Sequence, residues 1–216
     1  MKYDPSKEKC PLPHSIFRAC VTPRPIAWIS TTDKNGIDNL APFSQCQIVT
    51  IDPPMVMFCA NHYPDDTRKD SAKNAESMGW FVWNMATEDL KEAVNQSAMI
   101  VPSHVDEFEL ANVAKVKADL SHTPMVAESP CQLECKYIST QTIKGSSNLG
   151  TVDLILGEVV RIHVKDEYIK DGMMDVSKIR VLARMGYIDY ATISNSFSMQ
   201  VPMAPELLNT IMCGSD

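Results

Sequence analysis

The sequence is poor in glycine, and this scarcity argues against several nucleotide-binding loops. Only eight of its 216 residues are glycine, and neither the Gly-x-Gly-x-x-Gly pattern nor a P-loop occurs. A dinucleotide held by the glycine-rich loop of a Rossmann fold is therefore not expected. The Gly-x-Ser-x-Gly pattern is also missing, so no motif supports a serine nucleophile of the α/β-hydrolase type.

The sequence also lacks a basic stripe and a long apolar run. It carries 20 basic and 27 acidic residues, for a net charge of −7, which disfavours nucleic acid or an anionic membrane surface as a partner. No stretch reaches the roughly 18 apolar residues that a membrane span needs. Residues 1–12 are polar and charged and do not resemble a secretory signal, so we expect a cytoplasmic protein.

Cysteine is present, but without the spacing of a disulfide framework or a zinc site. The seven cysteines are an odd number, and reduced thiols in a cytosol fit this pattern best. Cys59 and His62 resemble half of a metal site, but no second half with zinc-like spacing follows. We therefore expect no bound metal. The cysteines stand at positions 10, 20, 46, 59, 131, 135 and 213.

The remaining pattern favours a mainly β fold with helical additions. Strand-like runs follow one another more often than they alternate with helices, so a β-barrel is expected rather than a parallel βαβ sheet. No composition break or repeat marks a second domain, and residues 1–216 are predicted to form one domain. Strands are expected at 26–32, from 37 to the Asp-Pro-Pro break at 52–54, and at 55–59, 80–85, 131–141 and 151–164; helices at 67–77 and 87–97, with a short one within 103–110.

The start of the first predicted helix is a candidate anion site. Thr67 is predicted to cap the helix, which would leave backbone amides free at its positive end beside Arg68 and Lys69. Ser71 adds a hydroxyl, so a phosphate would suit this position. The alternative is an ordinary solvated helix start with a threonine cap.

The segment 39–44 is a second candidate, because it places a proline inside an apparent strand. Pro42 cannot donate a ladder hydrogen bond, so the segment should lie at a sheet edge or a bulge. The free amides and carbonyls of such an edge suit the pyrimidine edge of a flavin. A plain strand kink at a barrel corner is the alternative.

His104 is a third candidate, in a polar segment beside Asp106 and Glu107. A histidine there suits contact with a second substrate or a proton shuttle. The alternative is a solvated surface histidine, which is the usual state of polar loop residues.

Eight short motifs, taken in order, resemble the flavin reductase-like FMN-binding split-barrel family. The resemblance covers residues 15–195 and implies a split β-barrel of Greek-key type, with an N-terminal arm and a C-terminal tail, residues 194–216, outside the common core. The motifs are VTPRPIAWIST at 21–31, NLAPFS at 39–44, DPPMVMF at 52–58, RKDS at 68–71, FVWN at 81–84, DEFELA at 106–111, GEVV at 157–160 and RMG at 184–186.

The resemblance also implies a ligand and an assembly: a homodimer that binds FMN without a covalent link at the subunit interface. Residues 184–187 would approach the cofactor from the barrel rim, and Ser71, where the family has threonine, keeps the hydroxyl. The family's ring and ribityl contacts fall on Asn39, Leu40, Ala41, Pro42, Phe43 and Ser44, and its phosphate contacts on Arg68, Lys69 and Ser71.

The leading functional hypothesis is an NAD(P)H-dependent flavin reductase, in which NADH or NADPH passes hydride to N5 of FMN. The flavin supplies this chemistry, so no catalytic side chain is required, and His104 is a candidate nicotinamide contact. An electron acceptor or a partner oxygenase would take up the electrons. Two alternatives stay open: a flavoredoxin-like electron carrier without its own nicotinamide site, and a non-enzymatic FMN-binding or structural protein.

Overall fold

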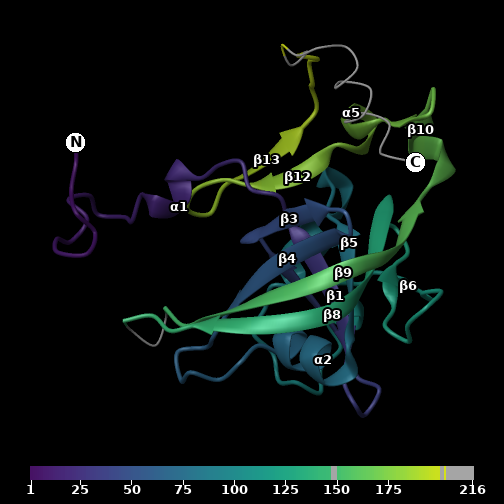
Figure 1. Ribbon diagram of the computed structural model, residues 1–216, viewed down its shortest axis with the longest axis horizontal. Coiled ribbons are helices and arrows are strands. Elements are labelled where there is room, and N and C mark those ends of the chain that lie inside the picture. The colour runs from purple at the N-terminus through teal and green to yellow at the C-terminus, as the bar shows by residue number, and fades with distance from the viewer. Residues whose placement is uncertain (147–149, 200–201, 203–216) are drawn as a thin grey trace.

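One antiparallel sheet of seven strands dominates the computed structural model, which describes residues 1–146, 150–199 and 202. The predicted mainly β fold with helical additions is confirmed (Figure 1). The sheet order is β2-β1-β5-β8-β9-β4-β3. Its strands are β1 (Ala27–Thr32), β2 (Asp38–Phe43), β3 (Cys46–Ile51), β4 (Pro54–Asn61), β5 (Trp80–Met85), β8 (Cys131–Ile143) and β9 (Val152–Val164).

The sheet bends round on itself, but its two edge strands do not pair with each other. Strands β2 and β3 follow one another in the chain, yet they lie at opposite edges of the sheet. The turn between them crosses the gap, and the Cys59 amide of β4 donates to the Gln45 carbonyl at 2.8 Å. The architecture within the described residues is therefore that of a barrel left open between β2 and β3.

The smaller elements cover the ends and one outer face of this barrel. Figure 1 shows α2 at one end, and α1 with the hairpin β12–β13 at the side away from it. The helices are α1 (Phe17–Cys20), α2 (Asp70–Met78), η1 (Glu88–Leu90), α3 (Lys91–Gln96), α4 (Glu107–Leu110), η2 (Asp166–Tyr168) and α5 (Val176–Ile179). The short strands are β6 (Lys115–Val116), β7 (Met125–Val126), β10 (Ile169–Lys170), β11 (Met173–Met174), β12 (Val181–Arg184) and β13 (Tyr190–Ile193).

Alternation along the strands divides the apolar residues between two cores. Inside the barrel, the ring of Phe58 lies 5.0 Å from that of Phe43 and 5.2 Å from that of Phe81, centroid to centroid. Outside it, Trp28 and Leu40 are fully buried in a second cluster with residues of α3 and α4. Successive side chains of a strand point to opposite faces, so one sheet serves both cores.

Several local expectations are confirmed. Strand β5 begins and ends where the sequence predicted, and β2, which contains Pro42, is an edge strand. The turn after β1 closes through a hydrogen bond from the Asp33 amide to the Ile37 carbonyl. Gly79 ends α2 with φ of 77°, a left-handed conformation that glycine adopts without strain.

Other expectations were wrong at element boundaries. The strand predicted from residue 37 to the Asp-Pro-Pro break is two strands, separated at the β2–β3 turn. Helix α2 begins three residues later than predicted, with Lys69 rather than Thr67 at the cap position. The Thr67 hydroxyl donates instead to Asp65 Oδ1 at 2.6 Å, and this local turn competes with capping. The predicted helix at 87–97 is split into η1 and α3, and the Thr87 side chain makes no cap bond.

Three further observations bear on the sequence analysis. No helix among the described residues is long and apolar enough to cross a membrane. The six cysteines in the part of the chain that the structure covers are unpaired thiols. The seventh cysteine and most of the tail, with its apolar residues at 207–212, lie outside the described residues.

Candidate functional site

A cavity of about 610 Å³ opens where β2 and β3 fail to pair. Its volume falls within the range of about 300–1,000 Å³ that is typical of small-molecule sites. Several parts of the chain contribute to it: the N-terminal arm with α1, strand β2 with the β2–β3 turn, β4, the starts of α2 and α4, residues 97–99, and the hairpin β12–β13.

Seven of the nine predicted cofactor residues line this cavity. Leu40 and Arg68 do not. The side chain of Leu40 is fully buried in the outer core, and Arg68 is engaged elsewhere. The seven are Asn39, Ala41, Pro42, Phe43, Ser44, Lys69 and Ser71.

A buried polar network joins the β2 part of the cavity to α2 and α4. The Ser71 hydroxyl donates to Asn39 Oδ1 at 2.6 Å, and Asn39 Nδ2 donates to the two Glu107 carboxylate oxygens at 3.0 and 2.9 Å. The Leu40 amide also donates to Glu107 Oε2, at 3.0 Å. These bonds fix the orientation of the Asn39 amide, so the polar edge of the cavity is preorganised.

Glu107 is a cavity residue for which the sequence predicted no role of its own. It is buried at the start of α4, and this burial raises the pKa of its carboxyl group. The sequence carried one signal, an acidic residue in the first turn of a short predicted helix. That signal does not reveal that the carboxylate contacts β2, where its partner Asn39 lies 68 positions earlier in the chain.

The start of α2 brings one cation, Lys69, and one acid, Asp70, to the cavity, and Asp70 pairs with Lys73 at 2.7 Å. Lys69 is half-buried, and its ammonium lies 4.0 Å from the centroid of the Tyr63 ring. Burial lowers the pKa of Lys69. No side chain caps α2, so the amides of its first turn and the positive end of its dipole face the cavity beside Lys69 and Ser71.

Arg68 points to a different set of partners. Its Nε donates to Asp153 Oδ2 and one Nη to Glu76 Oε2, each at 2.6 Å. Asp153 is fully buried and also accepts from the Thr142 hydroxyl at 2.6 Å. Burial alone would raise the pKa of Asp153, but the hydrogen bonds from Thr142 and Arg68 outweigh it and lower the pKa. Arg68 therefore neutralises a buried carboxylate at the end of the barrel.

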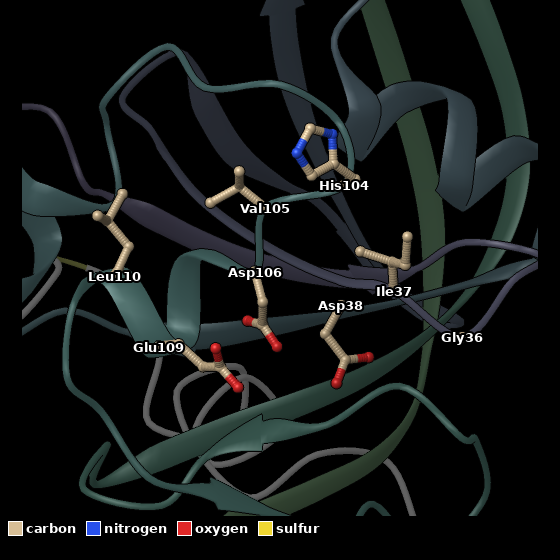
Figure 2. A pocket seen from close by; sticks show the side chains of 8 residues that line it. All are labelled: Gly36, Ile37, Asp38, His104, Val105, Asp106, Glu109 and Leu110. Carbon is tan, nitrogen blue, oxygen red and sulfur yellow. The ribbon is translucent and has the colours of Figure 1, made fainter.

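His104 lies in a second, separate pocket, which Figure 2 shows. The carboxylates of Asp38, Asp106 and Glu109 lie together there, and the imidazole stands apart from them. The ammonium of Lys115 bridges Asp38 and Asp106, so this acidic group already holds an internal cation. Within one chain, His104 is not part of the large cavity.

One group of side chains in the described residues has the spacing of a metal site. Ligand atoms of Asp119, Glu134 and His163 lie within 4.8 Å of one another. The Glu134 oxygens, however, accept from three backbone amides of residues 119–121 and from His163 Nε2 at 2.8 Å. These donors satisfy the carboxylate, so the group ties the 119–121 segment to the sheet.

The fold and the cavity together define a split β-barrel with a cavity at its open seam. Residues 18–180 match the family model of the flavin reductase like domain. The chain is 33% identical to the uncharacterized protein BH2278 of Halalkalibacterium halodurans, over 94% of this chain and 97% of that one. It therefore belongs to the flavin reductase-like family, as its motifs indicated.

Solved structures share the fold. Nitrilotriacetate monooxygenase component B from Bacillus cereus is similar with a TM-score of 0.84 and 26% identity, covering 92% of this chain and 98% of that one. A putative flavin reductase with a split barrel domain from Shewanella frigidimarina has a TM-score of 0.74 and 22% identity, with 88% and 90% covered. The predicted split-barrel fold is confirmed.

Proposed function

We propose that the chain binds FMN non-covalently in the large cavity and acts as a flavin-dependent oxidoreductase. The observation that carries the proposal is the meeting of two elements on one cavity, the unpaired edge of β2 and the uncapped start of α2. The first offers peptide acceptors beside an apolar wall, and the second offers amides, a dipole and a cation. FMN needs both, for a flat polar ring and for a phosphate.

Different residues of the chain bind the phosphate and the ring of the proposed FMN. Lys69 and the first-turn amides of α2, that of Ser71 among them, hold the phosphate, while Ala41, Pro42 and Phe43 form the wall for the ring. Leu40 takes part only through its backbone, which Glu107 holds in place. Bound FMN supplies the electron-transfer chemistry, and these residues bind and orient it.

The proposed electron donor is NADH or NADPH, which would pass hydride to the flavin from the open side of the cavity. The nitrilotriacetate monooxygenase component B named above suggests the acceptor, a partner oxygenase that uses the reduced flavin. The alternative is a flavoredoxin-like carrier, which would exchange electrons with proteins and have no nicotinamide site.

A second copy of the chain completes the proposed site. Large apolar side chains stand exposed around the seam: Phe17 is 70% exposed, Ile51 82% and Ile188 84%. Exposed apolar groups of this kind typically mark a contact surface. We propose that a homodimer buries them and encloses the cofactor.

The proposal is tested by loading the purified chain with FMN and recording its absorbance and its mass in solution. We expect one FMN bound per chain, a dimer, and bleaching of the flavin when NADH or NADPH is added without oxygen. A protein that takes up no FMN would contradict the proposal. Bleaching by a reduced protein partner or dithionite, but by neither nicotinamide, would favour the electron carrier.

A further inference from the structure

The end of the cavity away from α2 carries a group of arginines. Arg18, Arg24 and Arg184 all line the cavity, contributed by α1, by the segment before β1 and by β12. Figure 1 shows α1 and the hairpin β12–β13 together on the side of the barrel opposite α2. Lys69 and these arginines thus belong to different ends of one cavity.

The arginines at this end differ from the rest in their partners. The chain has six arginines, and three of them, Arg68, Arg161 and Arg180, each have a carboxylate oxygen within 4.0 Å. The three that line the cavity have no such carboxylate among the described residues. Among the described residues, the arginines away from the cavity are thus paired with carboxylates, and the three that line it are not.

Neutral groups hold two of these guanidinium groups in place. Arg24 donates to the carbonyls of Arg18, Val21 and Met185, and the backbones of Arg24 and Arg184 pair through two 2.9 Å bonds. Arg184 donates to the Tyr187 carbonyl at 2.6 Å and lies over the Tyr190 ring, 4.4 Å from its centroid. The positions of the charges are therefore fixed before any ligand binds, which reduces the cost of binding an anion.

The like charges also oppose one another. Burial, followed by the charges of Arg184 and Arg18, lowers the pKa of Arg24. An anion would relieve this repulsion and would meet the planar donor forks of two guanidinium groups, a geometry that suits phosphate oxygens. Tyr187 and Tyr190 line the cavity beside these arginines, and Arg184 covers one face of the Tyr190 ring.

We propose that Arg184, supported by Arg18 and Arg24, forms a second phosphate-binding subsite of the cavity. Its ligand is the phosphate portion of a phosphorylated second substrate, such as the pyrophosphate of a dinucleotide that donates electrons. The inference rests on the proposed function only in assigning the first phosphate position to the FMN bound at Lys69. It requires the two ligands to occupy the cavity together from opposite ends.

The test uses the FMN-loaded protein and titrates it with inorganic pyrophosphate, ADP-ribose and NADP⁺ by isothermal calorimetry. Arg184→Gln should weaken pyrophosphate binding about 10- to 150-fold, the effect of one lost charge-assisted contact of about 1.5–3 kcal/mol. Arg161→Gln is the matched control, since it removes the same charge from an exposed side chain of β9 that lines no part of this cavity. It should leave pyrophosphate binding unchanged.

A second variant keeps the inference testable if Arg184→Gln does not fold. Arg18 is exposed and its guanidinium donates to no described residue, so Arg18→Gln should fold normally and weaken pyrophosphate binding in the same direction. Unchanged pyrophosphate affinity in both variants, or no pyrophosphate binding by the wild-type holoprotein, would overturn the inference.

Two further outcomes show which ligand's phosphate the arginines bind. If Arg184→Gln weakens FMN but not riboflavin, the arginines hold the phosphate of the flavin itself, and the second-ligand subsite is refuted. If pyrophosphate binding depends on Arg184 while neither NADH nor NADPH bleaches the flavin, the subsite stands and the proposed reductase activity fails.

Discussion

Replacing Lys69 by alanine should distinguish FMN from riboflavin, the flavin without a phosphate. Lys69 is the only lysine that lines the described cavity, and it stands at the cap position of α2. A lost charge-assisted contact of about 1.5–3 kcal/mol corresponds to about 10- to 150-fold weaker FMN binding. Riboflavin affinity should stay the same, because riboflavin has no phosphate for Lys69 to bind.

Arg68→Ala is the informative companion, because the neighbouring cation has different partners. Its guanidinium is bound to Asp153 and Glu76, so its loss should change FMN and riboflavin affinity equally. The variant should instead lower the free energy of unfolding by about 1.5–3 kcal/mol, because buried Asp153 loses a charged donor. The bond to the exposed Glu76 adds little.

Both variants are measured by quenching of flavin fluorescence on titration with each apoprotein, and by urea unfolding without ligand. The ratio of FMN to riboflavin affinity should fall in Lys69→Ala and hold in Arg68→Ala, while stability falls in Arg68→Ala. The opposite pattern, with Arg68→Ala selectively weakening FMN and Lys69→Ala affecting neither flavin, would refute this assignment of the phosphate position.

Three other predictions follow from buried groups. Gly157→Ala should lower the free energy of unfolding by about 1–3 kcal/mol in chemical denaturation, because the added Cβ would lie 2.4 Å from the Phe81 ring. Glu107→Gln should weaken FMN binding and lower the free energy of unfolding by about 1–3 kcal/mol, because the NH2 group of the new glutamine would face the N–H donors of Asn39 and Leu40. Unaltered urea unfolding and FMN titration curves would contradict this. The pKa of Asp153 in the folded protein is lowered from the ordinary value of 3.8, so ionised Asp153 stabilises the fold above pH 3.8 and this contribution is lost as the pH falls through the folded-state pKa. The difference in unfolding free energy between wild type and Asp153→Asn should therefore shrink below about pH 4, as measured by acid titrations monitored by circular dichroism.

The features that the sequence predicted well are those with local causes. The hairpin after β1 follows from an Asn-Gly turn between apolar runs, and the edge position of β2 follows from Pro42. The end of α2 follows from Gly79. In each of these cases, the backbone preference of one or two residues decides the structure.

The site was less predictable where long-range pairing decides it. Arg68 and Lys69 are adjacent and equal in sign, and the family resemblance implied the same role for both, as phosphate contacts. Their environments differ because Asp153 of β9, 85 positions along the chain, reaches one of them. The Glu107 bonds to β2 are invisible to local patterns for the same reason.

The open seam of the barrel explains why the cavity lies where it does. In a fully closed barrel, β2 and β3 would satisfy each other's peptide groups and bring their side chains together. Here the chain turns between them without a ladder, and the turn is tied to β4 instead. At the β2 edge, the Leu40 amide is satisfied by the Glu107 carboxylate instead of by β3, and Pro42 has no amide hydrogen to donate. The break in the barrel therefore leaves the wall formed by Ala41, Pro42 and Phe43 open to the cavity rather than covered by a neighbouring strand, which is the space that the proposed flavin ring would fill.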